Sequence, residues 1–269
     1  MPPASGAAVA AGPAPAGFRG VALSALLAGL CPLIPLPLVD QWALTLVRRW
    51  AVGDLLHGHG LAASAFQVRI LAGEEPGRGG GCLPGVLAWA AVKVFFYVVK
   101  KLFRTLLVVL ILHESVRRTA ELFSEAYLLR HAAGLGAAAE ALAAGEAGAR
   151  RLRAAVAAAT REVDPQPALR TVRAALAGSW RLLRRGARRL ARALRRRRAA
   201  PAEEAVPVAE EADLLGGVID RLTEALWLQT DYRRRLEERF AAHWAGAALY
   251  YDRGSARPRD DRDPGRPES

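Results

Sequence analysis

The 269 residues of this chain, of which 52% are hydrophobic and 24% are charged, are enough to bury a sizeable core. Two cysteines, Cys31 and Cys82, stand in no paired motif, which argues against a disulfide scaffold and indicates a reducing compartment. The net charge of +12 and the pI of about 10.8 favour anionic partners, namely lipid headgroups, nucleic acid or acidic proteins.

The chain opens on an Ala/Pro-rich leader, residues 1–17, which we expect to be disordered. A secretory signal needs a basic region before its apolar stretch, and here only Arg19 precedes the apolar residues 21–30. The sequence therefore argues against a cleaved signal peptide, and it leaves an uncleaved membrane anchor open.

Residues 20–39 carry no charge and are long enough to span a bilayer, but Pro32, Pro35 and Pro37 interrupt their second half. We expect a short helix over 21–30, a turn, and a second helix that begins at Asp40, a good N-cap. Trp42 and Trp50 flank this second helix, as aromatic residues do at a membrane boundary. The pair is interpreted as a re-entrant or interfacial hairpin, with a buried hairpin in a soluble core as the alternative.

A long helix is predicted over residues 84–131, and its first half is very apolar. Its cations follow one helical face, namely Lys93, Lys100 and Arg104 with Lys101 beside them, while Trp89 lies in the apolar remainder. Such a helix fits the membrane interface, or a bundle in which its cations face inward or reach outward to water. A central helix of a soluble bundle is the other interpretation. The apolar character ends near Leu112, which is a candidate membrane boundary.

An Ala-rich region over 132–163 precedes a basic helix that we expect from Asp164-Pro165 to about Arg198. Sixteen arginines lie between residues 150 and 198, against two acids. One helical face is apolar: Leu169, Val172, Leu176, Trp180, Leu183, Ala187, Leu190 and Leu194. A basic amphipathic helix of this kind binds a membrane surface or a partner, and its charge also suits phosphates of DNA or RNA.

A last amphipathic helix is predicted over 212–250, and we expect the charged tail, 251–269, to be disordered. The apolar positions of this helix are Leu215, Val218, Leu222, Leu226, Leu236, Phe240 and Trp244. They are expected to pack against the basic helix or against a second copy of the chain, for which a coiled coil is one form.

The partial matches to catalytic, cofactor-binding and metal-binding motifs lack the residues or the structural context that these motifs need. His113-Glu114 starts like a zinc-protease pair, but the position that needs a second histidine is Arg117. The loop with His57 and His59 supplies no further ligands, and the Gly134–Ala139 match to a dinucleotide pattern follows a helix rather than a strand. We therefore expect no catalytic, cofactor-binding or metal site, and no enzyme.

The expected fold is all-α with no sheet: an apolar helical hairpin and a long helix, then basic amphipathic helices. The expected regions are a leader (1–17), an apolar membrane-associated module (18–131), a basic cytoplasmic arm (132–250) and a tail (251–269). The expected function is a structural or adaptor role at an anionic cytoplasmic membrane surface. The alternative is a soluble nucleic-acid-binding protein that uses residues 165–198. The residues predicted to touch lipid or another anion are Lys93, Lys100, Lys101, Arg104, Arg181, Arg184, Arg185, Arg188, Arg189 and Arg192, with Trp42, Trp50 and Trp89 at the membrane interface.

Overall fold

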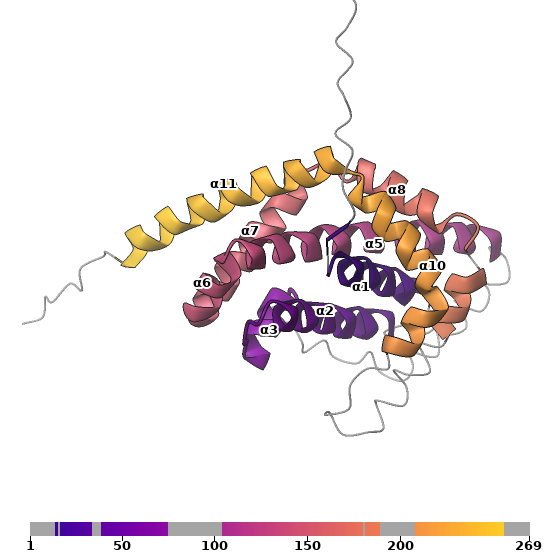
Figure 1. Ribbon diagram of the computed structural model, residues 1–269, viewed down its shortest axis with the longest axis horizontal. Helices are drawn as coiled ribbons and strands as arrows, with labels where there is room; N and C mark the ends of the chain where they lie inside the picture. The colour runs from indigo at the N-terminus through magenta and orange to yellow at the C-terminus, as the bar shows by residue number, and fades with distance from the viewer. Residues whose placement is uncertain are drawn as a thin grey trace, which may run out of the picture.

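Every regular element in the part of the chain that the structure describes is a helix, which confirms the all-α prediction (Figure 1). The computed structural model describes residues 14–15, 17–33, 39–74, 104–179, 181–188 and 208–255. Its elements are α1 (Phe18–Leu30), η1 (Cys31–Leu33), α2 (Val39–Gly58), α3 (Ala65–Leu71), α5 (Arg104–Gly134), α6 (Ala137–Ala143), α7 (Gly145–Glu162), α8 (Gln166–Leu176), α10 (Val208–Trp227) and α11 (Thr230–Ser255). Residues 181–188 form a further helical segment.

Helix α1 lies at the centre of the fold, enclosed by α5, α2 and α10 (Figure 1). Ten of its thirteen residues are buried, as expected of a helix that is apolar on all sides. The first limb of the predicted hairpin is therefore covered by the chain itself, which matches the buried alternative and corrects the interfacial interpretation of residues 21–30. The second limb, α2, begins at Val39, next to the predicted cap Asp40.

Two predicted helices are each broken in two. The basic helix begins at Gln166, with Pro165 rather than the predicted Asp164 in the N-cap position, and Asp164 accepts a hydrogen bond from the Gln166 N–H at 3.0 Å. It breaks at Gly178, whose φ of 77° is left-handed. The C-terminal helix breaks after Trp227, where the Arg233 guanidinium donates to the Trp227 carbonyl at 2.8 Å and lies over its ring. These breaks let α10 pack on α8 and α11 pack on α7.

One hydrophobic core joins all of these helices. It runs from Phe18 in α1 through Phe123 in α5 to Leu152 in α7 and Phe240 in α11, and these side chains are at most 1% exposed. The boundary predicted at residue 131 falls inside α5 and within this core, so the division into an apolar module and a basic arm is not visible in the packing.

Helices α1 and α5 approach each other closely at Gly29. Its carbonyl accepts a hydrogen bond from the Ser115 hydroxyl, and a β-carbon at Gly29 would stand 1.9 Å from Thr119 Oγ1. The absence of a side chain at Gly29 therefore sets the distance between the two central helices.

Replacing Gly29 with alanine is expected to destabilise the protein by about 2–3 kcal/mol, because the methyl group would push α1 off α5. The matched control is Gly217→Ala in α10, which has open space around it, with no described neighbour within 4 Å, and should stabilise the helix by up to about 1 kcal/mol. Urea unfolding followed by circular dichroism measures both. Equal effects of the two substitutions would contradict the close-packing account.

Stability is also expected to fall at alkaline pH through Tyr127, which links α5 to α11. Burial, together with the hydrogen bond that its hydroxyl donates to Glu237, raises the pKa of Tyr127 to about 12. An unfolded tyrosine ionises near pH 10, so this contribution is complete below about pH 10 and is lost as pH rises toward 12. Urea midpoints at about pH 8 and about pH 11 should differ less in Tyr127→Phe than in the wild type. A difference between the two midpoints that is as large in Tyr127→Phe as in the wild type would contradict the prediction.

Candidate functional site

The inner face of residues 181–188 packs against two other helices. Leu183 and Ala187 are each 1% exposed, and Gly186 lies against Leu215 of α10 and Leu30 at the end of α1. A β-carbon at Gly186 would be 3.3 Å from a Leu215 methyl group and 3.5 Å from a Leu30 methyl group. The segment is thereby held on the end of α1, with its other face turned to solvent.

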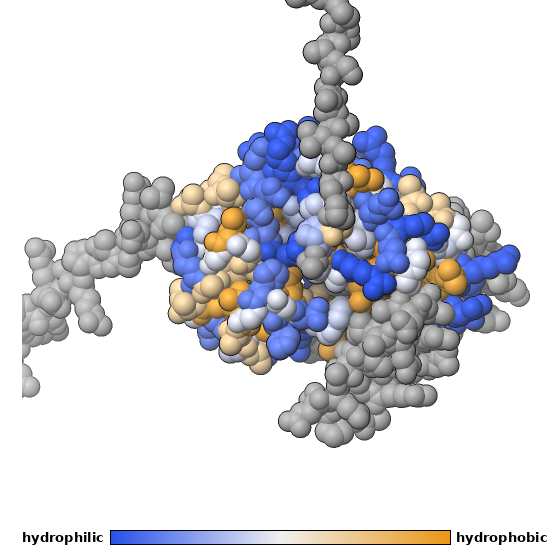
Figure 2. All heavy atoms as spheres, viewed as in Figure 1, coloured by the Kyte–Doolittle hydropathy of each residue, from blue (hydrophilic) through white to orange (hydrophobic). Residues whose placement is uncertain are grey.

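That outer face carries Arg181, Arg184, Arg185 and Arg188, which we call the arginine face. Steps of three, one and three place them in one stripe, and all four are exposed. Leu182 lies at the border between this stripe and the buried face and is 37% exposed. Figure 2 shows strongly hydrophilic residues, with a few hydrophobic ones, at the right-hand edge of the molecule, where this segment lies in Figure 1.

Acidic residues are missing from the sequence around the arginine face. No Asp or Glu occurs from residue 166 to residue 199. Within the described residues no ion pair reaches Arg181, Arg184 or Arg185. Helix α8, which precedes the segment, adds the exposed Arg170 and Arg173. The positive charge predicted from composition is therefore displayed outward here.

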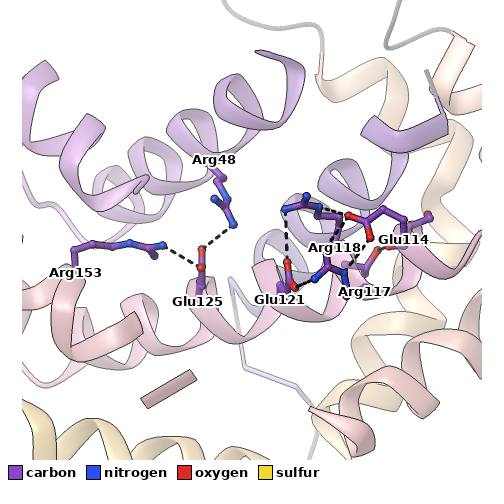
Figure 3. A network of polar contacts seen from close by, with 9 residues as sticks. Arg48, Glu114, Arg117, Arg118, Glu121, Glu125 and Arg153 are labelled. Atoms are coloured by element: carbon purple, nitrogen blue, oxygen red, sulfur yellow. Dashed lines mark hydrogen bonds and ion pairs between the residues drawn. The ribbon is translucent and has the colours of Figure 1, made fainter. Parts of the chain in front are cut away.

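Arg117 and Arg118 of α5 are, by contrast, paired with carboxylates (Figure 3). Arg118 contacts Glu114 at 2.7 Å and Arg117 contacts Glu121 at 3.2 Å, both at the i,i+4 spacing of neighbours on one helix face. The hydrogen bond from Arg117, reinforced by Arg118, holds the pKa of Glu114 below its usual value, so this carboxylate stays ionised. Glu114 is thus engaged by two arginines of its own helix.

A second paired group joins three helices around Glu125 and was not found from the sequence. The carboxylate, only 14% exposed, lies between Arg153 of α7 at 3.0 Å and Arg48 of α2 at 3.5 Å (Figure 3). A cavity of about 10 Å³ beside it is lined by Arg48, Glu125 and apolar side chains. This space holds about one water molecule, which is too little for a substrate. The group clamps helices rather than binding a ligand.

The other predicted contact residues divide into described and undescribed ones. Trp42, in the first turns of α2, is 43% exposed, whereas Trp50 is half-buried and packs against the core. Arg104 begins α5, but its side chain lies outside the description. Outside the described residues altogether are Trp89, Lys93, Lys100, Lys101, Arg189 and Arg192.

Exposed leucines lie near the start of α5, where the sequence predicts a membrane boundary close to Leu112. Leu110 is 62% exposed and Leu112 is 37% exposed. In the described parts of the chain, no helix combines the length and hydropathy that a membrane crossing requires. Nor do the described residues gather three or more His, Cys, Asp or Glu side chains into a group suited to a metal ion.

Comparison with known proteins places the chain in no family: no family model, no curated protein and no solved structure matches it.

Proposed function

We propose that this chain is a non-enzymatic protein that binds the anionic surface of a membrane, on its cytoplasmic side, in a structural or adaptor role. The observation that carries the proposal is the arginine face, four exposed cations in one stripe within a stretch free of acids. Each cation near an anionic leaflet contributes about 1 kcal/mol, so the stripe supplies enough attraction for peripheral binding.

The burial of residues 183, 186 and 187 supports this use of the segment. Because the inner face is anchored to Leu30 and Leu215, the arginines are presented by a packed element. Their arrangement needs no folding on contact with the surface, which lowers the entropy cost of binding. Leu182, partly exposed at the edge of the arginine face, suits the headgroup boundary, where apolar and cationic groups are both accommodated.

A nucleic-acid-binding role is the other use of the same charge, and Leu182 favours lipid over a polyphosphate chain. The two roles predict binding to different ligands. A membrane protein of this kind partitions onto anionic vesicles, while a nucleic-acid-binding protein leaves vesicles unbound and shows affinity for a duplex that falls steeply with salt.

The proposal is tested by sedimenting the full chain with vesicles of phosphatidylcholine alone or mixed with phosphatidylglycerol. The wild type should bind only the anionic vesicles. A variant with Arg181, Arg184, Arg185 and Arg188 all changed to glutamine should bind more than about tenfold more weakly, because as much as about 4 kcal/mol of attraction is removed.

The matched control changes four exposed arginines of α7 and α11 to glutamine: Arg150, Arg161, Arg234 and Arg235. It lowers the net charge equally, so any loss specific to the arginine face is a local effect. Equal weakening in both variants would leave only a dependence on total charge, and binding of duplex DNA but not vesicles would replace the proposal with the nucleic-acid role.

A further inference from the structure

Helix α5 projects past the end of α1. Ser115 of α5 lies opposite Gly29, to which it is hydrogen-bonded, and α1 ends at the next residue, Leu30. Residues 104–114 of α5 therefore continue beyond the last turn of α1 by about 16 Å. Figure 1 shows this start of α5 at the right of the view, beyond α1.

The projecting turns expose leucine where the rest of α5 buries its apolar residues. Leu110 is 62% exposed and Leu112 is 37% exposed, whereas Val116 and Ala120, one and two turns further on, are each 2% exposed. Between the two regions stands Glu114, held by its arginine partners. The charged residues Glu114, Arg117, Arg118 and Glu121 lie along one side of α5, which also carries Leu110, whereas Leu112 lies on the opposite side.

The arginine face borders this same end of the fold. Residues 181–188 touch Leu30, and α5 touches Gly29, so both elements meet the last turn of α1. Trp42 stands in the first turns of α2, which contacts η1 just after α1. Tertiary packing brings together, at one end of the fold, exposed leucines, an exposed tryptophan and a cationic stripe. These features are far apart in the sequence.

We infer that the chain docks end-on, with Leu110 and Leu112 inserted at the boundary between headgroups and acyl chains while the arginine face lies on the lipid phosphates. The inference rests on the proposed function and adds a hydrophobic contribution to it. An anionic bilayer is favoured over a protein partner because its surface offers phosphates and hydrocarbon side by side, matching the cations and leucines found together.

The test separates insertion from electrostatic attraction by salt. Binding of the full chain to the mixed vesicles is measured at about 0.15 M and about 1 M salt, since charge attraction is screened over about 3 Å at the higher value. The wild type should keep part of its binding at high salt. Leu110→Ser with Leu112→Ser should bind roughly tenfold more weakly and lose the salt-resistant part, since about one leucine side chain of exposed apolar area is removed.

The matched control is Leu135→Ser with Leu228→Ser, which removes leucines that are 65% and 56% exposed in turns elsewhere on the fold, and should bind as the wild type does. A gain-of-function variant, Leu110→Trp, should bind more tightly at high salt and show a blue-shifted fluorescence on vesicles. Circular dichroism checks that each variant is folded.

Salt-resistant binding that survives Leu110→Ser with Leu112→Ser would overturn the inference, and so would a Leu110→Trp variant that gains nothing. If the same leucine substitutions only convert an oligomer to a monomer, with vesicle binding intact, the surface is a contact between copies and the inference fails. If the inference fails in one of these ways but the variant with four arginines changed to glutamine still loses vesicle binding, the proposed function stands. A wild type that does not bind vesicles at all would contradict both the inference and the proposed function.

Discussion

The packing of α1 against α5 is the constraint on which the rest of the fold depends. From Gly20 to Leu30, α1 carries no charged side chain, so other helices have to cover most of its circumference. Gly29 lets α5 approach within the reach of a hydroxyl, and the rings of Phe18, Phe123 and Trp227 fill the other end of the contact, with centroids 5.1–5.9 Å apart. Helices α2 and α10 then close the remaining sides.

The unequal lengths of the two central helices explain where exposed surface arises. Thirteen residues make α1 about 20 Å long, while thirty-one residues make α5 about 46 Å long. Helix α5 can therefore be covered by α1 along only part of its length. Its far end, around Tyr127, is covered by α11 through the hydrogen bond to Glu237. Near its start Leu110 stays exposed.

Helical content and the apolar faces could be predicted from the sequence, because both depend on spacing along one helix. Leu215, Leu222 and Leu236, chosen by periodicity, are fully buried. The break at Gly178 could not be predicted in this way, because the apolar steps from Leu176 to Leu183 continue smoothly across it. What decides the break is tertiary packing, because α8 packs on α10 and α5, whereas residues 181–188 pack on Leu215 of α10 and Leu30 of α1.

The candidate site was predictable as far as residue type and exposure, since arginines on the polar side of a helix face water. Which arginines are neutralised was not predictable, because Arg48 and Arg153 find Glu125 across three helices. This pairing has a consequence for the electric field of the whole molecule. Carboxylates such as Glu74, Glu114 and Glu125 are held against arginines on α2, α5 and α7, which cancels charge over that part of the fold. Among the described residues no ion pair reaches Arg181, Arg184 or Arg185, so these arginines add to the attraction of an anionic surface. The part of the molecule that attracts an anionic surface is therefore determined by where the acids lie as much as by where the arginines lie.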